Sequence, residues 1–306
     1  ALRDWPALRI QHSPHPLVGD EYKVWPLLDF QSAIEDHEQR VTHIIRGKDL
    51  MDSTRKQTLL YEHFGWDYPE TLYWGRVKLH EFGGFSTSGM ASSISTGEYA
   101  GWDDPRLPTL RALRRRGFEA KSLISLWGEI GLTQKDISVS MQTLETLNSK
   151  NIDAYCERRF FVSEPIEIEI KGGDIASDAK IPRHPDGAIG GNREWVVGSK
   201  IFIQESDYTQ GKLRLKDYAD IQISGFDADI EGEGRSDGRP IIHWLPKEIS
   251  REAKMFVPEG EEIRELAGFI EDFELNIGEV YQFERIGFAK LERIKGEVAE
   301  LVWLHG

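Results

Sequence analysis

The chain has 306 residues, of which 39% are hydrophobic and 29% charged, a composition typical of a globular protein with room for two domains. No apolar run approaches the length that spans a bilayer, no basic-then-apolar leader is visible, and the lone Cys156 excludes an intrachain disulfide and a multi-cysteine zinc site. The net charge of −14 argues against a protein that binds nucleic acid over its whole surface, although one basic face remains compatible with it.

Residues 1–100 combine strand and helix patterns, as an α/β domain does. Residues 42–47 are typical of a buried strand that meets a turn. Residues 52–54 offer N-cap side chains for a helix that ends at Gly65, and residues 73–79 indicate a further strand.

Residues 101–153 are predicted to be helical. The boundary residues of the three predicted helices are Asp104 and Gly117 for the first, Gly131 as the end of the second, and a capping-box-like Thr133 and Asp136 at the start of the third. The third helix should carry an apolar stripe that begins at Ile137.

From residue 154 to 306 the pattern changes to short strands. Ile166, Ile168 and Ile170 alternate with charged residues, which is the two-residue period of a half-buried strand. Similar strands are predicted at 195–204, 213–215, 220–226, 240–245, 279–285 and 298–303. Many short strands with Gly-rich turns favour a barrel or a sandwich, so the fold class is multidomain, α/β plus all-β.

Motifs considered one at a time are weak. His12 and His15 lack a third ligand, which favours a loop over a metal site. The Gly/Ser-rich segment 83–89 could cradle phosphate, but a flexible loop explains it equally well. A cluster of arginines between residues 106 and 116 is either a solvated helix face or an RNA contact.

Several segments together resemble the glutamyl-tRNA synthetases, class I aminoacyl-tRNA synthetases, of the archaeal and eukaryotic type. These segments follow the family's order along nearly the whole chain: 24–30, 36–37, 41–49, 101–110, 114–117, 158–162, 192–194, 242–244 and 282–288. The archaeal and eukaryotic branch is favoured because the C-terminal half reads as strands, whereas the bacterial glutamyl enzymes carry a helical anticodon domain.

The resemblance implies a C-terminal portion that lacks the His-Ile-Gly-His half of the active site. It implies the second half of a Rossmann-type catalytic domain at 1–100, a helical stem-contact subdomain at 101–153 and anticodon-binding β-barrels at 154–306. The implied reaction of the full-length protein is the ATP-dependent ligation of glutamate to tRNA(Glu) through glutamyl-adenylate, with Mg²⁺ accompanying ATP and no zinc. A cytoplasmic monomer with no membrane partner is expected, and charging of tRNA(Gln) is left open.

For the amino-acid site the resemblance points to Arg46 as the cation for the substrate γ-carboxylate, because a guanidinium meets a carboxylate bidentately. Glutaminyl enzymes do not carry arginine at this position. The alternative is a structural ion pair from Arg46 to Asp49 or Asp36. Weaker candidates line the same segment, and they are Asp29, Ser32 and Leu28, the last in place of the family's usual tyrosine.

The remaining candidates face ATP and tRNA. Ser86, Thr87 and Ser88 align with the family's flexible triphosphate loop, although Thr87 stands where a lysine is usual. Arg158 falls where the family places an anticodon-contacting arginine, with a solvated strand face as the alternative. The predicted phosphate contacts in the helical subdomain are Arg106, Arg114, Arg115 and Arg116.

Two other functions remain open. Glutaminyl-tRNA synthetase is the near neighbour, which Arg46 disfavours. A fragment that binds tRNA and catalyses nothing is the alternative of a different class, because the chain by itself lacks the predicted nucleotide-binding half.

Overall fold

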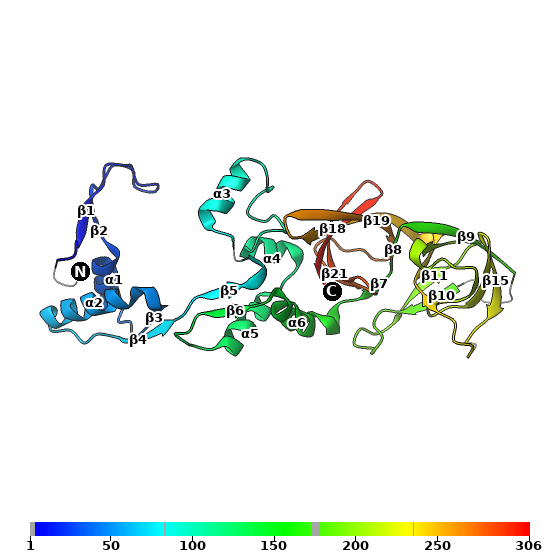
Figure 1. Ribbon diagram of the computed structural model, residues 1–306, viewed down its shortest axis with the longest axis horizontal. Helices are drawn as coiled ribbons and strands as arrows, with labels where there is room; N and C mark the ends of the chain where they lie inside the picture. Colours follow the sequence, from blue (N-terminus) through cyan, green and yellow to red (C-terminus); the bar gives the residue numbers. More distant parts are fainter. Residues whose placement is uncertain (1–3, 83, 173–177, 235) are drawn as a thin grey trace. The chain divides into compact units, whose positions relative to one another are not determined.

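The computed structural model describes residues 4–82, 84–172, 178–234 and 236–306, and it divides into two compact units (Figure 1). The first unit holds the described residues up to His80 together with Trp127–Ser140. The second unit holds Glu81–Leu126 and Met141–Gly306. The residues predicted to bind the amino acid therefore belong to the first unit, and those predicted to bind tRNA belong to the second.

The first unit contains a strand–helix–strand element. β3 (His43–Gly47) and β4 (Glu70–Trp74) pair in parallel and are connected through η1 (Lys48–Leu50) and α2 (Met51–Phe64), because parallel neighbours cannot be joined by a tight turn. The predicted strand exists and the helix end at Gly65, which has a φ of 69°, is confirmed. The prediction that the strand is buried was wrong, since Ile44 is its one buried residue and Ile45 is 59% exposed. The N-cap prediction was wrong, because α2 continues directly from the preceding 3₁₀ turn and starts at Met51.

A short antiparallel pair, β1 (Leu8–Ile10) and β2 (Val24–Pro26), precedes α1 (Leu28–Glu38). The buried Tyr61 of α2 donates its hydroxyl to the carbonyl of Ala33 in α1 at 2.8 Å. This bond fastens together the two helices that frame Arg46.

The single strand predicted over 73–79 is two strands in the structure. β4 ends at Trp74, and β5 (Val77–Leu79) pairs with a different partner. Between them, a Cβ at Gly75 would lie 2.1 Å from the carbonyl oxygen of Lys135, so the chain passes too close to this segment for any side chain. Such a close approach between distant segments is invisible in a local pattern.

The prediction of helix at Ile137 was also wrong. Ile137 begins β6 (Ile137–Val139), which pairs in parallel with β5. Asp136 caps no helix, since its carboxylate accepts a hydrogen bond from the backbone N–H of Arg76 at 2.9 Å and pairs with Lys48 at 2.9 Å. The helix with the predicted apolar stripe begins later, at Met141.

Four longer helices follow in the described chain, and their bounds are α3 (Thr87–Ser95), α4 (Leu110–Arg116), α5 (Ala120–Ile130) and α6 (Met141–Ile152). They belong to the second unit except for the end of α5, which from Trp127 onward belongs to the first. The end at Gly117 is confirmed, with a φ of 113°. The start at Asp104 was wrong, because Thr109 caps α4 by accepting from the N–H of Ala112 at 3.0 Å.

After α6 and η3 (Asp153–Tyr155), the described chain forms two seven-stranded sheets and a two-stranded one. The first sheet has the order β16-β13-β14-β15-β9-β12-β17, and the second has β7-β20-β21-β22-β18-β19-β8. The bounds are β7 (Arg158–Arg159), β8 (Phe161–Ser163), β9 (Pro165–Lys171), β10 (Asp178–Pro182), β11 (Asn192–Val196), β12 (Lys200–Gln204), β13 (Gly211–Leu215), β14 (Asp220–Ser224), β15 (Asp227–Gly232), β16 (Ile241–Ile242), β17 (Trp244–Pro246), β18 (Ser250–Glu259), β19 (Glu262–Glu271), β20 (Val280–Phe283), β21 (Gly287–Lys295) and β22 (Val298–His305). Each large sheet surrounds its own hydrophobic core, and the prediction of many short strands here is confirmed.

The longest strands, β18 and β19, were missed by the sequence patterns. They form a hairpin with ten paired residues on each strand, drawn in orange in Figure 1. Its turn uses Gly260 at a φ of 63°, where a side chain would be strained. A Cβ at Gly268 would lie 2.2 Å from the carbonyl of Val162, so β8 can pair with β19 only because this residue is glycine.

Candidate functional site

Arg46 lies on β3 on the same face as the buried Ile44, because side chains two residues apart point the same way along a strand. Its Nη1 donates to Gln57 Oε1 at 2.9 Å and lies 3.5 Å from Thr54 Oγ1. Both partners are on α2 and both are neutral. The guanidinium is therefore held in place by groups that leave its charge uncompensated.

The alternative of a structural ion pair is not found for Arg46. Within the described residues, neither Asp49 nor Asp36 nor any other carboxylate lies within ion-pairing distance of its guanidinium. Burial raises the pKa of Asp36, and the charge of Arg46 offsets only part of that effect. An arginine that is partly buried and lacks a carboxylate partner is suited to receive one from a ligand.

Gln57 connects the predicted amino-acid residues, and sequence reasoning missed it. The residue is only 1% exposed. Its Oε1 accepts from Arg46 and from the Tyr68 hydroxyl at 2.8 Å, while its Nε2 donates to the Asp29 carbonyl at 3.0 Å and to Ser32 Oγ at 2.6 Å. Three of the four predicted residues thus meet on one amide, which no sequence spacing indicated.

Asp29 is engaged by a lysine that was not predicted. Lys56 Nζ lies 2.6 Å from Asp29 Oδ2, and both side chains are less than one-fifth exposed. Burial by itself raises the pKa of Asp29, but hydrogen bonds from Lys56 and Ser53 outweigh it and hold the pKa below its usual range. The Asp29 carboxylate is thereby paired with Lys56, and the charge of Arg46 makes only a smaller contribution to its lowered pKa.

Leu28 is the outlying member of this group. It is 60% exposed, and only its carbonyl takes part in the network, by accepting from Ser32 Oγ at 2.7 Å. The structure therefore brings together Arg46, Asp29 and Ser32, with the Leu28 side chain turned to solvent.

The residues predicted for ATP lie at the start of α3 in the second unit. Ser86 caps the helix by accepting from the N–H of Gly89 at 3.1 Å, and Thr87 and Ser88 are its exposed first residues. Gly83, part of the predicted phosphate loop, lies outside the described residues. The N-terminal N–H groups of a helix can bind phosphate, so the phosphate prediction stays a prediction.

Arg106 is held within the protein. Its guanidinium forms a bidentate ion pair with the buried Asp104, through contacts of 2.9 and 2.7 Å. It also donates to the carbonyl of Glu261 at 2.9 Å and lies 4.6 Å from the ring centroid of Tyr99. These contacts join the start of the helical segment to the tip of the β18–β19 hairpin.

The arginines of α4 divide into two kinds. Arg115 pairs with Glu292 of β21, and the buried Arg116 donates to the carbonyl of Leu304, with burial lowering its pKa to about 10. Arg111 and Arg114 are exposed. A solvated face is thus the wrong description of Arg106, Arg115 and Arg116, and the phosphate contact predicted for the whole cluster stays a prediction that exposure favours for Arg114.

Arg158 is 7% exposed on β7. It donates to Asp153 Oδ1 at 2.8 Å and to the carbonyl of Cys156 at 3.2 Å. The alternative of a solvated strand face is therefore wrong, and the predicted base contact stays a prediction, one that would require Asp153 to share this guanidinium.

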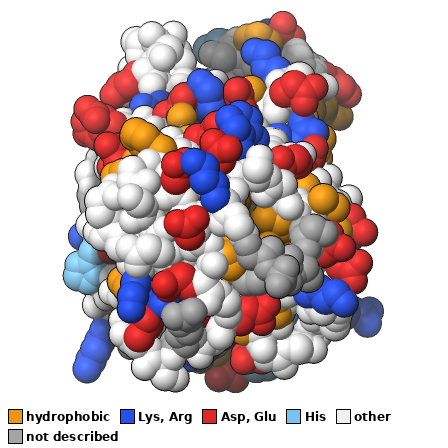
Figure 2. Space-filling model, turned by 90° about the vertical axis from the view of Figure 1, so that its right-hand side faces the viewer, with side chains coloured by type: hydrophobic (Ala, Val, Ile, Leu, Met, Phe, Trp, Pro, Cys, Tyr) orange, Lys and Arg blue, Asp and Glu red, His pale blue; other side chains and the backbone are white. Residues whose placement is uncertain are grey.

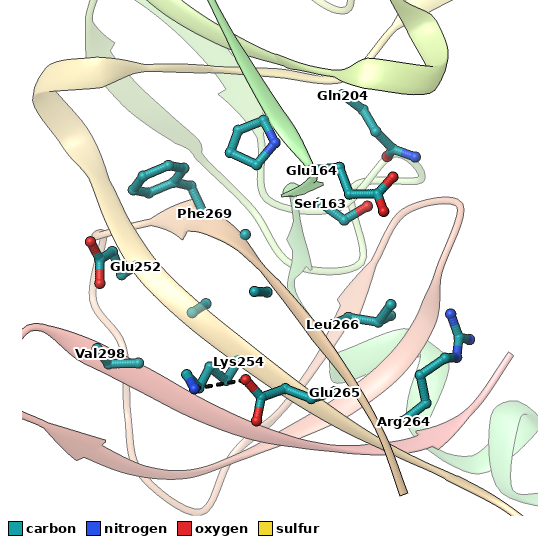
Figure 3. A pocket seen from close by; sticks show the side chains of 14 residues that line it. Ser163, Glu164, Gln204, Glu252, Lys254, Arg264, Glu265, Leu266, Phe269 and Val298 are labelled. Atoms are coloured by element: carbon teal, nitrogen blue, oxygen red, sulfur yellow. Dashed lines mark ion pairs between the residues drawn. The ribbon is translucent and has the colours of Figure 1, made fainter.

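A groove of about 670 Å³ runs along β18 and β19 (Figure 3). Lys254 and Glu265 face each other across neighbouring strands there at 2.7 Å, and Phe269 stacks on Phe202 with ring centroids 4.4 Å apart. Acidic and basic side chains are likewise interspersed over the face in Figure 2. Neither surface presents the single-sign positive charge that a polyanion needs.

The two histidines near the N-terminus have local partners. His15 stacks on Trp25 with ring centroids 4.8 Å apart, and its Nδ1 accepts from the N–H of Leu17 at 3.2 Å. Within the described ranges, no three His, Cys, Asp or Glu side chains gather as a metal site would require. Nor does any described helix have the length and apolarity to cross a membrane.

Comparison with protein families gives two matches that together cover most of the chain. Residues 1–154 match the family described as tRNA synthetases class I (E and Q), catalytic domain. Residues 156–237 match the family described as tRNA synthetases class I (E and Q), anti-codon binding domain. The two matches meet where the described helices give way to strands.

Among curated proteins, the chain is similar to archaeal proteins named Glutamate--tRNA ligase. It is 43% identical to that of Methanosarcina mazei over all of this chain and 55% of the relative, and 44% identical to that of Archaeoglobus fulgidus over 97% of this chain and 54% of the relative. The chain thus spans about half the length of these relatives. A glutamate-tRNA synthetase structure from Elizabethkingia anophelis overlaps at a TM-score of 0.27 and 18% identity over 42% of this chain and 31% of that one, too little to bear on the fold.

Proposed function

The chain belongs to the class I tRNA synthetases for glutamate and glutamine, and from this premise we propose that it is part of a glutamate–tRNA ligase. In a protein of the relatives' length, the glutamate α-carboxylate attacks the α-phosphate of ATP and releases pyrophosphate, which gives glutamyl-adenylate. The terminal adenosine of tRNA(Glu) then takes the acyl group, and AMP leaves. Positioning and electrostatic stabilisation carry such chemistry, and no protein nucleophile is required.

The observation that supports glutamate as the substrate is that the Arg46 guanidinium forms no ion pair with a described carboxylate. It is fixed by Gln57 at 2.9 Å and meets no carboxylate among the described residues. The substrate γ-carboxylate would accept two charge-assisted hydrogen bonds from the Arg46 guanidinium, whereas the neutral amide of glutamine offers only one acceptor oxygen. Glutaminyl-tRNA synthetase is therefore the less favoured alternative.

The ATP site is proposed in part on Ser86, Thr87 and Ser88, whose helix start offers backbone N–H groups to phosphate. Mg²⁺ is proposed only as a companion of the ATP phosphates, because a nucleotide and water supply most of its ligands in such sites. We further propose the catalytic, stem-contact and anticodon-binding parts at residues 1–100, 101–153 and 154–306, closed barrels in the last part, and a cytoplasmic monomer that binds tRNA(Glu).

The proposed function predicts a difference between this chain and a protein of the relatives' length. Only the longer protein should exchange ³²P-labelled pyrophosphate into ATP in the presence of glutamate and tRNA, since the 306-residue chain spans about 55% of such a protein. A tRNA-binding fragment is then the correct description of this chain in isolation. Formation of glutamyl-tRNA by the 306-residue chain would contradict the prediction.

The second unit should bind tRNA through its exposed arginines. Replacing Arg111 and Arg114 by glutamine should weaken the binding of all tRNAs alike and reduce the slope of log affinity against log salt by about one to two. The slope falls because binding with fewer phosphate contacts releases fewer counterions. The matched control is Arg115→Gln, whose arginine is already paired with Glu292. Fluorescence titration at several salt concentrations measures both slopes, and an unchanged slope in the double variant would leave Arg111 and Arg114 as solvated surface residues.

A further inference from the structure

We propose that Gln57 is a positioning residue that sets substrate specificity, because its neutral amide holds the guanidinium of Arg46 without neutralising it. The charge of Arg46 is thereby reserved for the carboxylate of the bound amino acid. This inference rests on the proposed function, since it assigns Arg46 to the substrate glutamate.

The neighbours of Gln57 fix which way its amide points. Arg46 can only donate and the carbonyl of Asp29 can only accept, so Oε1 must face Arg46 and Nε2 must face Asp29. Tyr68 and Ser32 occupy the second position on each side, at 2.8 and 2.6 Å. All four hydrogen-bonding positions of the amide are filled, and a carboxylate could not donate to the Asp29 carbonyl.

The surroundings also leave Arg46 without a carboxylate at ion-pairing distance among the described residues. Asp29, whose carbonyl belongs to the same network, has its carboxylate paired with Lys56 at 2.6 Å. Asp36 lies beyond ion-pairing distance, and burial raises its pKa. Two separate features, a neutral anchor and an aspartate paired elsewhere, therefore lead to the same result, an oriented cation that meets no carboxylate in the described part of the chain.

An unpaired guanidinium matters because charge decides between glutamate and glutamine. If a protein carboxylate already occupied Arg46, glutamate would have to displace it and would lose most of its advantage over the neutral substrate. The glutamine side chain at position 57 is as long as that of glutamate and so reaches Arg46, but it carries no charge that would compete with the substrate carboxylate.

The first test needs only the 306-residue chain. Labelling of Arg46 by phenylglyoxal, followed by mass spectrometry, should slow by roughly fivefold in Gln57→Glu, because the introduced carboxylate would pair with the guanidinium. The matched control is Gln31→Glu, which adds the same charge at an exposed site of α1. Gln57→Met keeps the shape without the hydrogen bond and should leave Arg46 labelling as fast as in the wild type or faster.

The second test uses the protein of the relatives' length. Gln57→Glu should raise KM for glutamate by about tenfold while KM for ATP and kcat change little, because only binding of the charged substrate is lost. An equal rise in KM for glutamate and for ATP would overturn the inference. So would labelling of Arg46 that is as fast in Gln57→Glu as in Gln31→Glu. The assignment of Arg46 to the substrate fails separately, if Arg46→Gln leaves glutamate kinetics unchanged, and the proposed function fails if the longer protein shows no glutamate-dependent pyrophosphate exchange.

Discussion

Arg46→Gln in the protein of the relatives' length is expected to lower kcat/KM for glutamate by a factor of about 30 to about 1000. This factor corresponds to a loss of roughly 2–4 kcal/mol of transition-state binding. The loss follows from removing both the charge and the bidentate geometry that meet the substrate carboxylate. Stability should change little, because Arg46 bonds only to neutral side chains and Gln57 keeps its bond from Tyr68.

The measurement is steady-state pyrophosphate exchange with glutamate and with glutamine as competing substrates. Arg55→Gln is the matched control, since Arg55 lies on α2 in the same unit but is about two-thirds exposed and pairs only with Asp52. Glutamate kinetics within about twofold of the wild type in Arg46→Gln would show that this guanidinium serves the fold and not the substrate.

Glu271→Gln is expected to destabilise the second unit of the 306-residue chain by about 3–5 kcal/mol, because breaking a buried ion pair leaves uncompensated charge. Glu271 is fully buried at the end of β19. It accepts from Arg193, from the N–H of Phe160 at 3.2 Å and from Trp195 Nε1 at 3.1 Å.

A second buried guanidinium, that of Arg159, lies 3.6 Å from the same carboxylate. The substitution keeps the size of the side chain, so the effect reports the lost charge and not a cavity. Because Arg193 and Trp195 are on β11 while Glu271 ends β19, the carboxylate joins the two-stranded sheet to the second large sheet.

Urea unfolding followed by tryptophan fluorescence, with hydrogen exchange at β11 and β19, measures the destabilisation. Glu262→Gln at the exposed start of β19 is the matched control, with an expected change below about 0.5 kcal/mol. If Glu271→Gln unfolds at the same urea concentration as this control, the network contributes no net stability.

Short-range patterns were enough to predict those features that depend on neighbours in the chain. The strand at β3, the helix ends at Gly65 and Gly117 and the many strands after residue 154 follow from two-residue alternation and from left-handed glycines. Family membership was likewise readable, because motifs in a fixed order identify a family without any knowledge of contacts. Arg46 stood out for the same reason.

Features that depend on distant contacts could not be predicted in this way. Between β4 and β5, Gly75 lies so close to the Lys135 carbonyl that no side chain fits there, and the strand at Ile137 pairs with β5, which lies at residues 77–79, far earlier in the chain. Arg116 reads as a surface arginine until β22 covers it.

The sequence by itself thus determined the family, the coarse succession of helix-rich and strand-rich regions, and the identity of Arg46 as the cation of interest. Only the tertiary structure decided that this cation meets no carboxylate among the described residues, because α1 and α2 bring Asp29 and Ser32 onto the Gln57 amide that holds Arg46. The physical reason is that the state of a charge depends on what surrounds it in space. Lys56 removes Asp29 from competition, and its 27-residue separation in the chain gives no sign of that pairing.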